Sequence, residues 1–318
     1  MPSLAPPPSV SIVMPCFNAG QHLPRSLASV RAQTLADWEL IVVDDGSTDG
    51  SAHWLAPQAE PRLRLLQRPH QGASAARNSG IDHARGEYIA FLDADDTWAP
   101  DFLQRLRAAL LDRPDAVLAY CGWQKFGVPA AEAKPFVPPD YETPDKRTLL
   151  FAACRWPIHA ALARRAPLLD CGGFPTHLQN AEDYALWLEL ATRGPIVRVP
   201  EVLAQYHFHG SGQASAHRAR AALQLLDAQH AYLARHPDFA RSLGPDRRRM
   251  PYQGLLRAGF AAYWARDLPA ARTLFRRALR AGYGRPAQWR YMLPALLPLR
   301  LHAALLALRA RSGETRPD

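Results

Sequence analysis

The chain has 318 residues, of which 48% are hydrophobic, and it carries a formal net charge of +9. This composition excludes a largely disordered chain, and the length accommodates one large α/β domain with an appendage. The charge is uneven: residues 216–318 contain 19 Arg and 6 acidic residues, whereas residues 1–215 contain 19 Lys or Arg and 23 acidic residues. Such a basic region attracts anionic membrane surfaces or nucleic acid.

The four cysteines, Cys16, Cys121, Cys154 and Cys171, are scattered and include no Cys-x-x-Cys pair, so neither a zinc site nor a redox motif is indicated. Reduced thiols in a cytosolic setting are therefore expected, with Cys16 as a buried thiol. No charged-then-apolar signal sequence begins the chain, and residues 1–8 are expected to form a disordered leader.

Strand-like and helix-like segments alternate over the first 121 residues. The strand-like runs are 10–14, 39–43, 63–67, 87–92 and 116–121, and the helical patterns between them are 21–33, 48–57, 72–84 and 99–112. The last helical pattern places Phe102, Leu103, Leu106 and Leu110 on one apolar stripe. The alternation predicts an α/β fold with a doubly wound, mostly parallel sheet flanked by helices.

Three of the predicted strands end in residues suited to ligand binding. These residues are Pro15, Phe17 and Asn18 after the first strand, Asp44 and Asp45 after the second, and Asp93, Asp95 and Asp96 after the fourth. Ligands in open α/β sheets bind outside the carboxyl ends of the strands. We therefore expect these residues to share one edge of the sheet.

The carboxylates of Asp93, Asp95 and Asp96 admit two interpretations. Clustered like charges raise one another's pKa, and a divalent cation such as Mg²⁺, which prefers oxygen ligands, compensates them. In the alternative, the three lie in a solvated loop where Asp96 caps the next helix. The second acidic strand end, at Asp44 and Asp45, favours the cation.

Two features follow in the middle of the chain. Residues 124–146 contain five prolines and predict a long mobile loop, which either borders an acceptor site or is a surface insertion. After a tight turn at Gly172-Gly173, an amphipathic helix opens near Glu182 and Asp183.

The chain after residue 215 has helical character throughout. Its segment 289–308 is apolar but is interrupted by Pro294, Pro298 and Arg300, which argues against a membrane-spanning helix. Trp, Tyr and leucines with flanking arginines favour an interfacial segment on a membrane surface, and a packed helical hairpin is the alternative.

Four phrases of the sequence together resemble the motifs of family 2 glycosyltransferases of the GT-A fold. They are Ser11-Ile-Val-Met-Pro-Cys-Phe-Asn18, Val42-Val-Asp-Asp-Gly-Ser-Thr-Asp49, Gly72-Ala-Ser-Ala-Ala-Arg-Asn-Ser-Gly80 and Phe91-Leu-Asp-Ala-Asp-Asp96. The resemblance covers about residues 8–215, in the family's order and spacing. It implies a GT-A domain over 9–215 with a mixed, mostly parallel sheet, and a basic helical region over 216–318 as an appendage.

The resemblance implies an inverting enzyme that moves a sugar from a nucleoside-diphosphate donor to an acceptor hydroxyl. A UDP-sugar is the expected donor. The donor-binding residues would be Pro15, Phe17, Asn18, Asp44, Asp45, Arg77, Asp93 and His207. A divalent metal, Mn²⁺ or Mg²⁺, would be held by Asp95, with Asp93 and His209 beside it. Asp183 would be the general base, and Glu182 would support acceptor or sugar binding.

Several of these assignments have alternatives. Asp44 is suited equally to a structural bond with a neighbouring loop. Arg77 has a second interpretation as an ion pair at a helix start, and carboxylates such as Glu182 and Asp183 are favoured in the first turn of any helix. His207 stands where the family commonly has Arg, which weakens its proposed contact with phosphate.

The expected acceptor is a glycan or a lipid-linked glycan of cell-surface polysaccharide biosynthesis. The sequence lacks the Gln-x-x-Arg-Trp motif of the processive synthases, which favours an enzyme that adds a single sugar. We expect a cytoplasmic protein, with peripheral binding to the inner face of the cytoplasmic membrane. One alternative is a catalytically inactive nucleotide-sugar-binding homologue, although Asp45, Asp95 and Asp183 are all present. A basic nucleic-acid-binding protein is the other, but no binding motif accompanies the charge, so no nucleic acid partner is expected.

Overall fold

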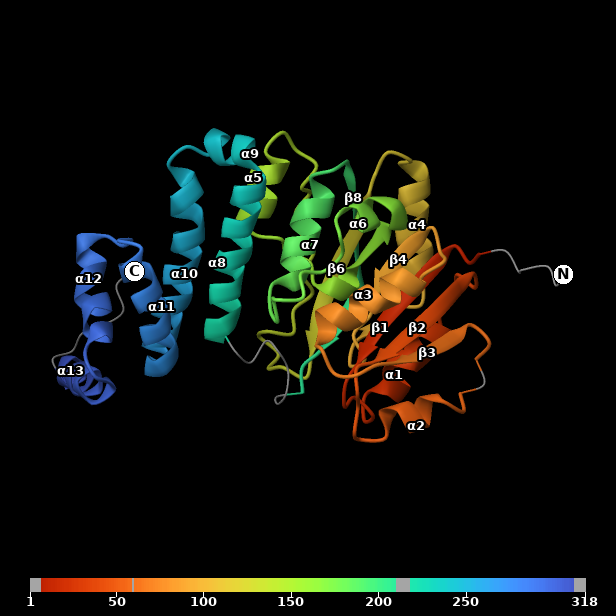
Figure 1. Cartoon of the computed structure of the whole chain (residues 1–318), viewed down its shortest axis with the longest axis horizontal. Coiled ribbons are helices and arrows are strands. Elements are labelled where there is room, and N and C mark those ends of the chain that lie inside the picture. The colour runs from red at the N-terminus through yellow and green to blue at the C-terminus, as the bar shows by residue number, and fades with distance from the viewer. Residues whose placement is uncertain (1–6, 59, 210–217, 312–318) are drawn as a thin grey trace. The chain divides into compact units, whose positions relative to one another are not determined.

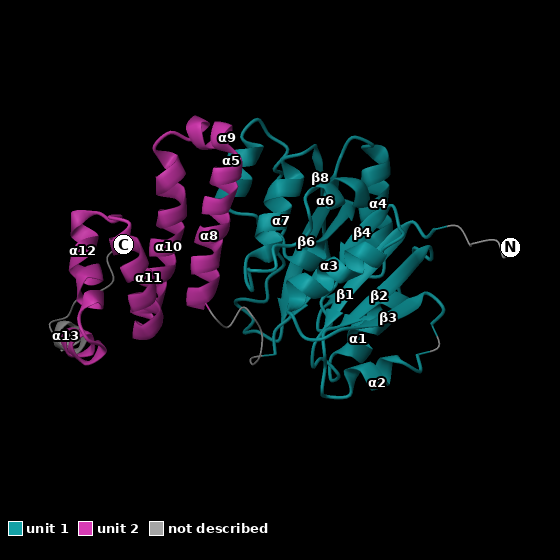
Figure 2. Ribbon diagram, in the orientation of Figure 1, with its two compact units in different colours: residues 1–213 teal, residues 214–318 magenta. Residues whose placement is uncertain are grey.

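The computed structural model describes residues 7–58, 60–209 and 218–311, with side chains up to residue 305. Most of the predicted leader, and residues 210–217 after the His207 segment, lie outside these ranges. The chain divides into two compact units, residues 1–213 (unit 1) and 214–318 (unit 2), shown in Figure 2.

Unit 1 is built on a mixed sheet. Its strands are β1 (Val10–Cys16), β2 (Trp38–Asp44), β3 (Leu63–Gln67), β4 (Tyr88–Phe91), β5 (Thr97–Trp98), β6 (Leu118–Phe126), β7 (Ala161–Arg164) and β8 (Ile196–His207). Over the described residues their order is β3-β2-β1-β4-β7-β6-β8-β5. Figure 1 labels all of these strands except β5 and β7. The first four strands are parallel, β7 is antiparallel to both neighbours, and β5 is antiparallel to β8. The predicted mixed, mostly parallel sheet is confirmed.

Helices flank this sheet. They are α1 (Leu23–Arg31), α2 (Ser51–Leu55), α3 (Ala73–His83), α4 (Phe102–Asp112), α5 (Lys146–Ala152), α6 (Arg165–Asp170) and α7 (Glu182–Ala191), with a 3-10 turn, η1 (Ile158–Ala160). Helix α3 packs on β1 and β2, and α4 packs on β6, β7 and β8. The predicted core face of α4 is confirmed, because Phe102, Leu103, Leu106 and Leu110 are all buried. Strands β1, β2 and β4 are mostly apolar and are buried almost throughout, as expected for parallel strands that are covered on both faces.

The sequence patterns do not predict β5, β7 or β8. Strand β8 is not predicted because it contains Pro200. Proline cannot donate a hydrogen bond to a neighbouring strand, so its presence argues against a central strand. The structure accommodates it with a bulge: Cys121 of β6 pairs with Val199, whereas the next residue, Gly122, pairs with Val202.

The acidic ends of β2 and β4 emerge at one edge of the sheet, on the two sides of β1. The backbone N–H of Asp45 donates to the carbonyl of Cys16 at 2.8 Å, and that of Leu92 donates to the carbonyl of Val13 at 3.1 Å. Because β2 and β4 both run parallel to β1, the residues that follow them lie around the end of β1.

Unit 2 is helical. Its elements are α8 (Arg218–Arg235), α9 (Pro237–Ser242), α10 (Asp246–Trp264), α11 (Leu268–Arg280), α12 (Pro286–Met292), the 3-10 turn η3 (Leu293–Leu296) and α13 (Leu299–Arg311). Helices α8, α10 and α11 pack on one another around a core that includes Leu226, Tyr263 and Phe275. Among the described helices of the chain, none combines the length and the apolar character needed to cross a membrane.

Candidate functional site

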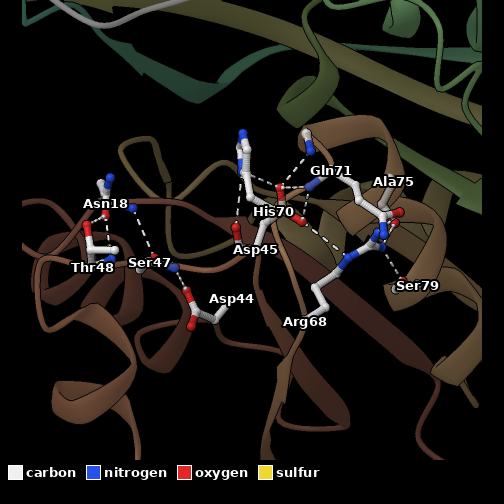
Figure 3. A network of polar contacts seen from close by, with 11 residues as sticks. Asn18, Asp44, Asp45, Ser47, Thr48, Arg68, His70, Gln71, Ala75 and Ser79 are labelled. Atoms are coloured by element: carbon white, nitrogen blue, oxygen red, sulfur yellow. Dashed lines mark hydrogen bonds and ion pairs between the residues drawn. The ribbon is translucent and has the colours of Figure 1, made fainter.

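The loops after β1 and β2 are tied together by Asn18. Its backbone has a positive φ of 50°, which Asn tolerates better than most residues. Its side-chain oxygen accepts from the N–H of Thr48 at 2.8 Å, and its own N–H donates to the hydroxyl of Ser47 at 3.0 Å (Figure 3). The carboxylate of Asp44 accepts from the N–H of Ser47 at 3.1 Å. For Asp44 these contacts favour a role in shaping the loop.

Asp45 holds the loop that follows β3. Its buried carboxylate accepts from the backbone N–H groups of Gln71, at 3.1 Å, and of Gly72, at 2.7 Å. It also pairs with Nε of Arg68 at 3.2 Å and with Nδ1 of His70 at 2.9 Å (Figure 3). Asp45 therefore fixes this loop beside β1, and its contact with a nucleobase stays a prediction.

An exposed aromatic pair lies at the same edge. Phe17 stacks on His70 with ring centroids 4.0 Å apart, and both side chains are about half exposed. Such a flat surface is suited to stacking on a base. Sequence reasoning missed His70, because nothing in its local pattern links it to Asp45 or Phe17. Pro15 is half-buried in β1, opposite Val43.

Arg77 of α3 bridges two acidic segments. Its buried guanidinium lies 2.6 Å from Oδ1 of Asp93 and 3.0 Å from Oε1 of Glu182. Although burial alone would lower its pKa, the charges of Asp93 and Glu182 raise the pKa of Arg77 further above its ordinary value. The contacts favour the ion-pair alternative for Arg77 over direct contact with the nucleotide, and they bring the strand end of β4 to the start of α7.

The predicted turn before α7 packs directly against α3, the helix that carries Arg77. Gly172 and Gly173 both have positive φ, and a Cβ on Gly173 would lie only 2.5 Å from the side-chain oxygen of Asn78 on α3. The amide of Asn78 exchanges hydrogen bonds with the backbone of Phe174, at 2.8 and 2.9 Å. Glycine is required here because the turn lies directly against α3.

Replacement of Arg77 by Met tests the bridge. The substitution leaves Asp93 and Glu182 without their cation, and we expect the free energy of unfolding to fall by about 3 kcal/mol. Urea denaturation followed by circular dichroism measures the change. Arg113→Met, which removes an exposed pair with Asp115, is the control and should cost less than about 1 kcal/mol. Equal losses in the two variants would contradict the proposed role of Arg77.

Asp95 and His209 meet at this edge. Nε2 of His209 lies 2.9 Å from Oδ2 of Asp95, and its ring stacks on His22 at 4.4 Å. Over the described ranges of the chain, no group of three His, Cys, Asp or Glu is placed to hold a metal. The Asp95–His209 pair nevertheless offers an oxygen and a nitrogen donor, and carboxylate oxygens suit Mg²⁺ and Mn²⁺. Asp93, predicted beside the metal, contacts Arg77 through its Oδ1, and its place beside a metal stays a prediction.

Asp96 is a buried structural residue. Its Oδ2 lies 3.0 Å from Nδ1 of the buried His159, and its Oδ1 accepts from the N–H of His207 at 2.8 Å. Burial raises the pKa of the Asp96 carboxyl. The idea that Asp96 caps the next helix is wrong, because α4 begins at Phe102 with Asp101 at its N-cap. Asp96 anchors the end of β8 instead.

His207 is directed into unit 1. Its Nε2 lies 2.9 Å from the hydroxyl of Thr97, and its ring stacks on Phe126 at 5.2 Å. Burial, helped by the charge of Arg25, lowers the pKa of His207 to about 4. A lowered pKa favours the neutral imidazole, and the contact of His207 with phosphate stays a prediction.

Asp183 lies in the first turn of α7, half-buried. Burial and the neighbouring Glu182 raise its pKa to about 6, and its Oδ1 accepts from the N–H of Tyr184 at 2.7 Å. The preceding residue, Ala181, has a left-handed backbone with φ of 62°, a local strain often found at functional sites. A carboxylate with a pKa near neutrality is well matched to proton abstraction.

Known proteins resemble this chain in sequence and in fold. Residues 11–168 match the model of "Glycosyl transferase family 2". A β-1,3-glucosyltransferase of Escherichia coli, WfgD, named for UDP-Glc and α-D-GlcNAc-diphosphoundecaprenol, is 33% identical over 182 residues, which are 57% of this chain and 69% of WfgD. The O-antigen biosynthesis protein RfbC of Myxococcus xanthus is 32% identical over 217 residues, which are 66% of this chain but only 16% of RfbC.

A solved structure shares the fold. The mannosyltransferase PcManGT of Pyrobaculum calidifontis, solved with GDP-Man and Mn²⁺, is 24% identical, with a TM-score of 0.59 over 99% of this chain and 84% of that one. The GT-A-type fold is thus supported by structure, and the family by the sequence match to WfgD. The chain belongs to glycosyl transferase family 2.

Proposed function

We propose that the protein is an inverting glycosyltransferase that moves a sugar from a UDP-sugar to a hydroxyl of a glycan or lipid-linked acceptor in cell-surface polysaccharide biosynthesis. The observation that carries the proposal is the Arg77 bridge, which joins Asp93 to Glu182, the neighbour of Asp183, although Asp93 and Glu182 are 89 positions apart in the sequence. The bridge brings the acidic end of β4 close to the start of α7, where the candidate base Asp183 lies.

The donor is assigned to the loops around the end of β1. Phe17 and His70 offer a stacking surface for the base, and Asp45 and Asn18 hold the adjacent loops. UDP is the proposed nucleotide because WfgD is named for UDP-Glc. Asp95 and His209 would hold Mn²⁺ or Mg²⁺, which when bound neutralises the charge that develops on the leaving diphosphate.

Asp183 is proposed to take the proton from the acceptor hydroxyl. As the acceptor oxygen forms its bond to the anomeric carbon, the bond to the diphosphate breaks, UDP leaves and the proton passes to the Asp183 carboxylate. A single direct displacement inverts the anomeric configuration. Glu182 is held by Arg77 and keeps the start of α7 in place.

A panel of nucleotide sugars tests the proposal. UDP should raise the melting temperature in the presence of Mn²⁺, since a ligand at 100 times its Kd adds about 2.7 kcal/mol to the stability of the native state. At least one UDP-sugar should release UDP when an acceptor extract is added. Stabilisation by UDP without any turnover would favour an inactive homologue, and stabilisation by single-stranded DNA or RNA alone would favour nucleic acid binding.

Unit 2 carries an exposed apolar surface that fits the proposed membrane association. Its side chains are 37–57% exposed and belong to Trp289, Leu293, Leu296, Leu297, Leu299, Leu301 and Leu305. Arg285, Arg290 and Arg300 lie in the same segment. Leucines and Trp with arginines beside them are typical of segments that bind anionic lipid surfaces. We propose that this segment holds the enzyme at the inner face of the cytoplasmic membrane, where a lipid-linked acceptor is available.

Vesicle flotation tests this association. The protein should float with vesicles that contain phosphatidylglycerol and should float much less with pure phosphatidylcholine. The double variant Leu296→Ser/Leu301→Ser should lose most of its binding, whereas Leu111→Ser, an equally exposed leucine of unit 1, should keep it. Unchanged flotation of the double variant would instead support a packed hairpin without membrane contact.

A further inference from the structure

A cavity of about 530 Å³ lies beside Asp183 in unit 1. Aromatic and basic side chains dominate its wall, namely those of Trp123, Phe136 and Trp156 and of Lys125, Lys134 and Arg155. Asp183 and Glu132 supply the carboxylates. A concave site with aromatic walls and a few charged groups is a common form of ligand pocket in proteins.

The proline-rich segment after β6 forms part of this wall. The backbones of Trp123 and Phe136 exchange hydrogen bonds, both at 2.9 Å, so the segment returns to pair with its own strand. Nε1 of Trp123 donates to the carbonyl of Arg155 at 3.1 Å. Residues 124–136 thus border a cavity that also contacts Asp183, which favours the first of the two interpretations of this segment.

Trp156 contributes a fixed aromatic ring to the wall of the cavity. Its buried ring stacks on Tyr120, with centroids 4.4 Å apart, and is thereby fixed in orientation. Its Nε1 donates to no acceptor within the described part of the chain. This N–H is itself buried, so the ring of Trp156, and not its N–H, is what lines the cavity. The aromatic rings offer apolar faces for the C–H groups of a sugar ring.

The basic groups of the wall are available for a negatively charged molecule. In the described residues, no ion pair contains Lys125, Lys134 or Arg155. Lys125 lies with its Nζ 5.9 Å from the centroid of the Trp123 ring. Three cationic side chains face two carboxylates, and one of these carboxylates is the candidate base. The excess positive charge is complementary to an anionic ligand.

We propose that this cavity binds the acceptor and that the acceptor is anionic near its reactive hydroxyl. The negative group is either a carboxylate on the acceptor sugar or the diphosphate that links the glycan to a lipid. The inference rests on the proposed function, because it places the acceptor hydroxyl next to Asp183. The cations would hold the anion while Trp123, Phe136 and Trp156 contact the sugar.

Calorimetric titration with three probes tests the inference in the presence of UDP and Mn²⁺. The probes are a disaccharide ending in glucuronic acid, GlcNAc-diphosphate on a short alkyl chain, and neutral chitobiose. One anionic probe should bind at least about tenfold more tightly than chitobiose, because charge-assisted hydrogen bonds are the stronger ones. The variant Lys125→Gln/Lys134→Gln should lose this preference. The control Arg113→Gln removes a surface charge outside the cavity and should retain it.

The outcomes separate this inference from the proposed function. Whichever anionic probe is preferred identifies the source of the negative charge. Equal affinities for charged and neutral probes, no binding of any probe, or an unchanged preference in the double variant would overturn the inference. If UDP binds in the presence of Mn²⁺ in those cases, the proposed function stands and only the inference about the acceptor is overturned. Absence of UDP binding overturns the proposed function and this inference together.

Discussion

Replacement of Asp183 by Asn should lower kcat by about 10²–10⁴-fold while donor binding is retained, because a positioned general base contributes a factor of this size. Asn has the same shape but cannot accept the proton from the acceptor hydroxyl. Steady-state kinetics of UDP release gives kcat, and calorimetry with UDP and Mn²⁺ gives donor affinity. An Asn variant that transfers sugar at the wild-type rate would remove Asp183 from its proposed role.

The pH dependence supplies an independent check on Asp183. Because its pKa is raised to about 6, sugar transfer by the wild type should fall as the pH drops below 6 and the carboxylate becomes protonated. The residual activity of the Asp183→Asn variant should not show this fall below pH 6. The pKa of Asp183 in the folded state lies above its ordinary value of 3.8, so folding becomes less favourable as the pH rises from about 4 to 6. At pH 7–8 the Asn variant should therefore be at least as stable as the wild type.

Asp95→Ala should reduce metal-stimulated sugar transfer at least about 100-fold, because a Lewis acid contributes several kcal/mol to the stabilisation of transition-state charge. Asp95 is only partly buried and contacts His209, so its loss should leave the fold intact. Turnover of a UDP-sugar across a series of Mn²⁺ concentrations measures the effect.

The control for Asp95 is Asp82→Ala, which removes an exposed carboxylate of α3 away from the strand ends. Its dependence on Mn²⁺ should match that of the wild type. An Asp95→Ala enzyme with the same maximal rate and the same response to Mn²⁺ would exclude Asp95 as a metal ligand.

Local sequence patterns were sufficient for most of the framework of unit 1. The apolar runs of β1, β2 and β4 and the stripe on α4 are encoded in short windows, because burial of a strand or helix face imposes a short period. The position of carboxylates after β2 and β4 is also a local signal. Strand direction then places both at one edge.

Contacts between distant segments explain what the patterns missed. The bridge from Arg77 to Glu182 and the pairing of Asp96 with His159 depend on side chains that meet only in the folded chain. No periodicity marks such partners. Strand β8 was not predicted because it contains Pro200. A proline fits this strand only at the bulge, which forms when β8 pairs with β6.

The crystal structure of the protein with UDP and Mn²⁺ tests the central claim, that the ends of β1, β2 and β4 form one nucleotide site. We predict uracil near Phe17 and His70, the diphosphate at the same edge, and the metal bound to Asp95. Nucleotide bound away from these strand ends, or a metal with no contact to Asp95, would contradict the account.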